Sequence, residues 1–120
     1  MSKKKSEVRK AFRYDTFDRD EHYCKWCGAG PHYESANSLL DAHHITDRNE
    51  MPGGGYVMEN GITLCKVDKE GDEADSCHMK AELFHISGGE EWTEGMHPDD
   101  LYKLIGSSKE LAIKAAEKLK

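Results

Sequence analysis

The stretch SLLDAHHIT at residues 38–46 is rich in Leu and Ile, predicts a strand, and carries two adjacent histidines. A second strand is predicted by GITLCK at residues 61–66, and a helix by CHMKAELF at residues 77–84. We expect three apolar positions in this helix: Met79, Leu83 and Phe84. Two strands followed by a helix predict a small α+β core.

The segments around this core are expected to be a helix and two irregular connections. Residues 7–17 contain no Gly or Pro and have apolar residues at i, i+3 and i+4, which predicts an N-terminal helix. Residues 48–58 contain a proline and three consecutive glycines, so we expect a loop whose backbone can approach another group closely. The acidic residues 67–76 are expected to be irregular.

Two further helices are predicted near the C-terminus. The first is expected over residues 98–105, because it starts with a proline and two aspartates and is followed by Gly106. Ser107 and Glu110 have the spacing of a capping box, which predicts the start of the last helix. We expect its apolar stripe to pack in the core: Leu111, Ala112, Ala115, Ala116 and Leu119. The lysines leave a second interpretation open, a helix that faces a partner or DNA: Lys109, Lys114, Lys118 and Lys120.

Four cysteines predict a structural zinc site. Cys24 and Cys27 form a C-x-x-C pair, a spacing that lets one tight turn supply two ligands of a tetrahedral ion. Cys65 lies near the end of the second predicted strand and Cys77 begins the helix, and the long gap between them costs little loop entropy. Only 37% of the 120 residues are apolar, which favours a metal staple. The competing interpretation, a thioredoxin-like redox pair, lacks a surrounding βαβ pattern.

Charge is unevenly distributed along the chain. The formal net charge is −6, yet residues 1–13 carry six Lys/Arg and one acid, whereas residues 67–100 carry two bases and eleven acids. A basic N-terminal arm can bind phosphates even in an acidic protein. The other interpretation is a solvated, disordered tail.

Nothing in the sequence predicts a membrane or export segment. No stretch approaches the ~20 apolar residues that a membrane span requires. The basic N-terminus also lacks the apolar region of a secretory signal. We therefore expect a cytoplasmic protein with reduced cysteines and no membrane partner.

Three histidines are expected to converge on the core. His43 and His44 would face opposite sides of a regular strand, so both reach one substrate only if the strand ends and the chain bends there. A zinc ion shared by Cys65 and Cys77 would clamp the second strand to the helix. That clamp would bring His78 near the first strand.

With these elements in this order, the chain resembles the HNH (ββα-metal, His-Me finger) endonucleases, in their zinc-binding, four-cysteine version. The resemblance covers about residues 17–84 and rests on RDEHYCKWCG at 19–28, DAHHI at 41–45, ENGITLC at 59–65 and CHMKAE at 77–82. Where the family usually separates its last two cysteines by two residues, this chain has an acidic insertion. The expected organisation is one HNH nuclease domain over residues 1–120, with a basic arm or helix at 1–16 and C-terminal helices at 97–119.

The resemblance implies a role for each site residue. His44 matches the general base, and Asn60 matches the residue that pins the loop and helps to orient this base. His43 and His78 match the ligands of a catalytic divalent ion, which would be Mn²⁺, Mg²⁺ or another transition metal, and imidazole ligands favour Mn²⁺ over Mg²⁺. Three more residues are open as further ligands or orienting groups: Asp41 (beside His43), Glu82 and His85.

The predicted function is therefore a metal-dependent DNA endonuclease. One such site in a monomer would nick one strand at a time, with little sequence specificity. Phosphate contacts to duplex DNA are expected from Lys3, Lys4, Lys5, Arg9, Lys10 and Arg13. Two alternatives stay open: a non-catalytic zinc-ribbon module that binds nucleic acid, and a ribonuclease.

Overall fold

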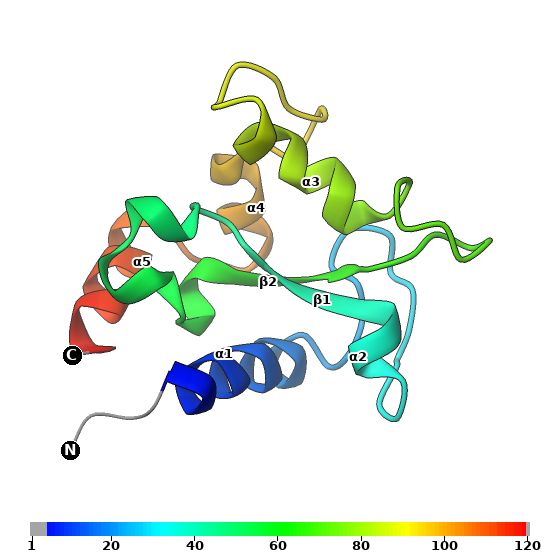
Figure 1. The fold of residues 1–120 in the computed structure, drawn as a ribbon, viewed down its shortest axis with the longest axis horizontal. Coiled ribbons are helices and arrows are strands. Elements are labelled where there is room, and N and C mark those ends of the chain that lie inside the picture. The colour runs from blue at the N-terminus through cyan, green and yellow to red at the C-terminus, as the bar shows by residue number, and fades with distance from the viewer. Residues whose placement is uncertain (1–4, 120) are drawn as a thin grey trace.

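A two-stranded antiparallel hairpin lies at the centre of the computed structural model, which describes residues 5–119 (Figure 1). Strand β1 (Leu40–His44) pairs with β2 (Gly61–Cys65), so that Leu40 lies opposite Cys65 and His44 opposite Gly61. The expected α+β class, with its N-terminal helix, hairpin and C-terminal helices, is confirmed. Three residues with predicted phosphate or partner contacts lie outside the described part of the chain: Lys3, Lys4 and Lys120.

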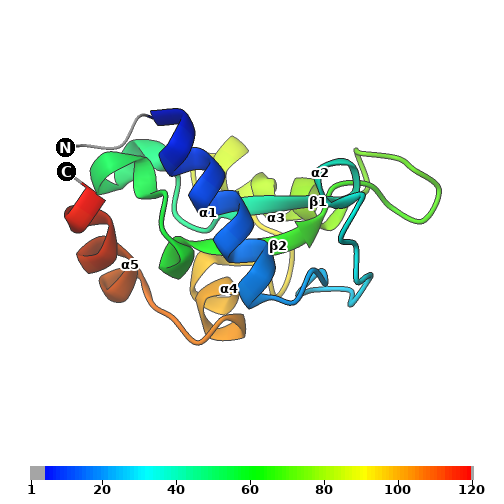
Figure 2. The ribbon, with the colours of Figure 1, turned by 90° about the horizontal axis from the view of Figure 1, so that it is seen from below.

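Helices cover both faces of the hairpin. Helix α1 (Lys5–Arg19) lies on one face, and α3 (Cys77–Ile86) and α4 (Pro98–Leu104) lie on the other (Figures 1 and 2). Helix α5 (Lys109–Ala116) packs beside the connection between the strands, which forms three short 3₁₀ turns: Arg48–Glu50, Pro52–Gly55 and Met58–Asn60.

Strand alternation divides the core into two clusters. Leu40 and Ala42 face α1 and pack with Phe12 and Phe17, whereas Ile62 and Leu64 face α3 and α4. The second cluster is completed by buried residues of the helices: Cys77, Ala81, Leu101, Tyr102, Ala112 and Ala116. The hairpin thus has one packed apolar cluster on each of its two faces.

The C-terminal end of α1 is tied to the start of β2. A Cβ atom on Gly61 would lie 2.6 Å from Thr16 Oγ1, so the helix approaches the strand more closely than any other residue would permit. Arg19 donates hydrogen bonds to the Met58 and Gly61 carbonyls at 2.6 and 2.7 Å and forms a bidentate pair with Asp20. These bonds hold α1 against β2 at a defined position.

The first predicted strand is shorter than expected. Residues 38 and 39 belong to the short helix α2 (Ala36–Leu39), and residues 45 and 46 follow the strand, so β1 keeps only the five residues that pair with β2. The second strand and the four predicted helices begin within two residues of the expected positions.

Two details of the helices were predicted wrongly. Met79 is exposed, because Cys77 and Ala81 are the α3 residues that face the core. Leu111 is also exposed, and Ile113 packs on the core in its place.

The cap of α5 is one residue later than predicted. Ser108, not Ser107, accepts the hydrogen bond from the Leu111 amide, at 3.1 Å. The hydroxyl of Ser107 instead donates to the Glu59 carbonyl at 2.9 Å, which ties the chain before α5 to the loop before β2.

Replacing Gly55 by alanine tests the packing of the loop between the strands. Gly55 has φ +68°, and an added Cβ would lie 2.7 Å from Asn60 Nδ2 and 2.9 Å from Met51 Cβ. Gly71 has a similar φ of +83° with open space around it, so Gly71→Ala is a control for backbone strain alone. We expect Gly71→Ala to lower the free energy of unfolding by ~1 kcal/mol, because of backbone strain alone. Gly55→Ala should lower it by ~1–3 kcal/mol more than Gly71→Ala, because the added methyl group also clashes. Both are measured by urea unfolding at the same zinc concentration. Equal losses would show that the loop does not pack as described.

Candidate functional site

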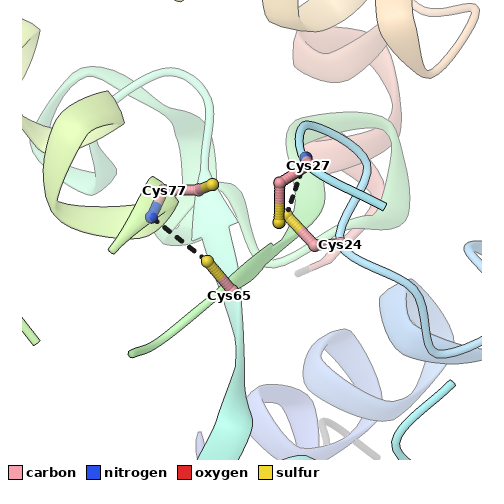
Figure 3. Close-up of side chains that lie close together, drawn as sticks. All are labelled: Cys24, Cys27, Cys65 and Cys77. Atoms are coloured by element: carbon pink, nitrogen blue, oxygen red, sulfur yellow. Dashed lines mark hydrogen bonds between the residues drawn. The ribbon is translucent and has the colours of Figure 1, made fainter. Parts of the chain in front are cut away.

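The four cysteines gather from three separate parts of the chain. Cys24 and Cys27 come from the loop after α1, Cys65 ends β2, and Cys77 begins α3 (Figure 3). Their sulfur atoms all lie within 4.8 Å of one another and form no disulfide. A tetrahedral zinc ion with ~2.3 Å bonds would hold its sulfurs about 3.8 Å apart, so this cluster fits a zinc site.

Backbone hydrogen bonds support the sulfurs as thiolates. The Cys27 amide donates to Cys24 Sγ at 3.4 Å, and the Cys77 amide donates to Cys65 Sγ at 3.3 Å. A hydrogen bond from the Cys77 thiol lowers the pKa of Cys24 to about 5 and raises that of Cys77. Because several thiolates so close together repel one another, a dication would stabilise the cluster.

The two adjacent histidines face opposite sides of β1, as strand geometry requires. His43 is 1% exposed and its ring lies 5.3 Å from that of His78 and 5.4 Å from that of His85, both on α3. His44 is the last residue of β1, and its ring stacks on Phe12 of α1 at 4.5 Å between centroids.

Helix α3 brings a carboxylate between the histidines on its side of the sheet. Glu82 Oε1 lies 3.1 Å from His43 Nδ1 and 3.3 Å from His78 Nε2. His43, Glu82 and His85 each place a possible ligand atom within 4.8 Å of the others, and His78 adjoins this group through Glu82. Glu82 and His85, which the sequence left open, therefore lie at the centre of the cluster.

The donor atoms of this cluster fit a divalent ion. His43 Nδ1 is buried and has no aligned hydrogen-bond partner despite its proximity to Glu82. His85 Nε2 donates to the His44 carbonyl at 2.9 Å, which leaves the lone pair of Nδ1 available in the neutral ring. Burial opposes ionisation of Glu82, but the proximity of the His43 and His78 rings outweighs it and lowers the pKa of Glu82. Two imidazoles and a carboxylate form a borderline ligand set for a transition metal.

Asp41 does not orient His43 as the sequence suggested. Asp41 Oδ2 lies 3.3 Å from His78 Nδ1, and Asp41 Oδ1 accepts a 2.8 Å hydrogen bond from Arg13 of α1. The Asp41 carboxylate thus links Arg13 of α1 to His78 of α3.

His44 is neutral at physiological pH. Burial is the main cause that lowers its pKa to about 4, and repulsion from His43 and Arg48 acts in the same direction. Its Nε2 atom is buried without a hydrogen-bond partner, and its side chain borders the neighbouring groove. A neutral ring is the form that accepts a proton.

Asn60 is fully buried and pins the loop that follows β1. Its Oδ1 accepts hydrogen bonds from the Thr46 amide at 2.9 Å and the Tyr102 hydroxyl at 2.7 Å. Its Nδ2 donates to the carbonyls of Thr46 and Gly55 at 3.1 and 3.2 Å. Asn60 therefore acts on the site by holding the chain just after His44.

An open groove of about 440 Å³ runs along the free edge of β1, between α1 and α3. His44, His78, Glu82 and His85 border it, so the two faces of β1 meet in one groove at the strand edge. Three arginines and two aromatic residues also border it: Arg9, Arg13, Arg48, Phe12 and Tyr56. Neither Arg48 nor Tyr56 is predicted as a site residue by the sequence, in which only the glycines before Tyr56 indicate a close approach.

Zinc analysis tests the four-cysteine cluster. We expect purified protein to contain one tightly held zinc ion per chain, and Cys77→Ser to lose this ion together with much of the stability, because metal binding supplies folding free energy. Native mass spectrometry and thermal unfolding with and without chelator provide the measurements. A metal-free protein with an unchanged melting temperature, or a Cys65–Cys77 disulfide, would contradict the assignment.

Comparisons of the chain with protein families, curated proteins and solved structures found no match. Among the described residues, no helix is long and apolar enough to cross a membrane. Function is therefore inferred from the residues of the site and their geometry.

Proposed function

We propose that this protein is a metal-dependent endonuclease of the HNH type that hydrolyses phosphodiester bonds in DNA. The observation that supports this proposal best is the pairing of a neutral His44 with a cluster of potential metal ligands across the edge of one strand. Phosphodiester hydrolysis needs a base for the attacking water and positive charge near the phosphate oxygens. The groove brings candidates for both tasks together.

His44 would act as the general base. Its ring borders the groove, and stacking on Phe12 together with edge contact to Tyr56 restrains its orientation. A neutral imidazole can take a proton from a water molecule that attacks the phosphorus atom. Asn60 is a positioning residue, since it holds Thr46 and the start of the following loop from within the core.

His43 and His78, with Glu82 and His85 beside them, would hold the catalytic divalent ion. Such an ion, when bound, neutralises charge on the scissile phosphate and on the leaving oxygen. Glu82 Oε1 lies next to both His43 Nδ1 and His78 Nε2, so an ion bound there would take all three atoms as ligands, while Asp41 at Nδ1 of His78 would restrain that ring. The His85–His44 hydrogen bond connects this ligand cluster directly to the backbone of the base.

The basic residues of α1 support a nucleic-acid substrate. Lys5, Arg9 and Lys10 are exposed on the helix that forms one wall of the groove, while Arg13 is engaged with Asp41. A single groove of this kind would cut one strand at a time, so supercoiled plasmid should pass first to open circle. The residues at the groove give no major-groove reading element, which supports low sequence specificity.

Removal of the His44 imidazole tests the base. His44→Ala should lower cleavage of plasmid DNA by about 100- to 10,000-fold, as loss of a general base does, while zinc content and melting temperature stay close to wild type. His32→Ala is a matched control, because His32 is outside the groove. Nicking assays on DNA, with a parallel assay on RNA, provide the measurement.

Three results would contradict this function. Undiminished cleavage by His44→Ala would exclude His44 as the base. DNA binding without any cleavage in the presence of Mn²⁺ would favour the zinc-ribbon module. Faster cleavage of RNA than of DNA would make the protein a ribonuclease.

The choice of metal tests the ligand cluster. Because imidazoles dominate the donors and Mg²⁺ prefers oxygen ligands, we expect faster cleavage with Mn²⁺ than with Mg²⁺. The same series should show no cleavage after removal of free divalent ions while the cysteine-bound zinc remains. A clear preference for Mg²⁺ would mean that Asp41 and Glu82 dominate the binding of the ion.

A further inference from the structure

Two arginines at the groove have no carboxylate partner. Among the described residues, Arg13 is paired with Asp41, whereas neither Arg9 nor Arg48 has a carboxylate oxygen within 4 Å. Both are exposed, yet both border the same groove as His44. A guanidinium that faces an open groove without an internal counter-charge is suited to an external anion.

One aromatic side chain holds both guanidinium groups. The Arg9 guanidinium carbon lies 5.5 Å from the centre of the Tyr56 ring, and Arg48 Nη1 donates a 2.9 Å hydrogen bond to the Tyr56 hydroxyl. The same ring contacts His44 edge-on at 4.7 Å between centroids and Phe12 at 5.6 Å. Tyr56 therefore lies between the proposed base and two unpaired positive charges.

The local charges separate the groove into two parts. Asp41 and Glu82 lie on the side of the histidine cluster, where a divalent ion would balance them, while Arg9 and Arg48 lie around Tyr56. Asp47 also borders the groove, but it is not within ion-pair distance of either arginine. An anion beside Tyr56 would thus be separate from the phosphate under attack at His44.

We propose that Arg9 and Arg48, held by Tyr56, form a second phosphate subsite that binds a phosphate next to the scissile one in a polynucleotide strand. This inference rests on the proposed function and deepens it, because it defines the substrate as a strand with at least two consecutive phosphates. A diester with a single phosphate leaves this subsite empty. The subsite contributes affinity and positions the strand, and the chemistry stays with His44 and the ion.

DNA binding and two substrates test the subsite. Binding of a fluorescein-labelled duplex is measured by anisotropy over a range of salt, without added divalent ion. Cleavage with Mn²⁺ is then compared for the same duplex and for bis(p-nitrophenyl) phosphate, which has one phosphate. The variants are Arg9→Ala, Arg48→Ala and Tyr56→Phe, with Lys10→Ala as the control, because Lys10 is an exposed cation of α1 outside the groove.

Each arginine variant should bind DNA about tenfold more weakly than the wild type. The slope of log binding constant against log salt concentration (the salt slope) should become smaller in magnitude by about one. The KM for DNA should rise, while the rate on bis(p-nitrophenyl) phosphate stays at the wild-type level. Tyr56→Phe keeps both charges but frees Arg48, so affinity should fall by a smaller factor with an unchanged salt slope. Lys10→Ala should lose less affinity than either arginine variant.

The possible failures are distinguishable. Arginine variants that match Lys10→Ala in affinity and salt slope would overturn the subsite, even if the wild-type protein cleaves both substrates. Arginine-dependent DNA binding without cleavage of either substrate would support the subsite and overturn the endonuclease function. An equal loss of rate on both substrates would also overturn the subsite, because the arginines would then act at the scissile phosphate.

Discussion

The convergence of four sulfur atoms is the constraint on which the rest of the structure depends. Cys65 ends β2 and Cys77 begins α3, so a metal that joined them would determine how α3 lies against the hairpin. Helix α3 carries the three side chains that lie next to His43: His78, Glu82 and His85. They follow Cys77 on the first three turns of this helix, so the position of Cys77 also determines theirs. In a chain with so few apolar residues, packing alone would leave this helix weakly held. The cysteine cluster and the histidine cluster are therefore one structural unit.

A single short strand supplies both parts of the proposed chemistry. Because neighbouring residues of a strand point in opposite directions, His43 enters the buried cluster below α3 and His44 lies against Phe12 of α1. The two environments differ in what they provide: carboxylates and imidazoles on one side, an aromatic contact on the other. His44 borders one groove at the free edge of β1 together with Glu82 and His85, the α3 neighbours of the buried His43. Asn60 completes the arrangement from the core, because it holds the chain directly after β1.

Local patterns predicted the elements of the fold, and long-range packing decided the rest. The apolar run of β2, the C-x-x-C turn and the proline at the start of α4 each carry their signal within a few residues. The hydrogen bond from His85 to the His44 carbonyl joins residues 41 positions apart in the sequence. It depends on how α3 packs on β1, so no local spacing predicts it. The contact of Arg48 with Tyr56 likewise depends on the turns of the glycine-rich loop. Ser107 has the spacing of a helix cap, but its hydroxyl donates to the distant Glu59 carbonyl, and Ser108 caps the helix.

The most direct test of this account is anomalous diffraction from crystals of the purified protein soaked in Mn²⁺. We expect two separate anomalous peaks: zinc at the centre of the four cysteine sulfurs, and manganese bound by His43 and the α3 side chains beside it, next to the groove that His44 borders. Two peaks at these places would show that the protein holds a structural zinc ion and a separate ion at the histidine cluster. Zinc among the histidines with free or oxidised cysteines, or manganese bound away from His43, would contradict the account.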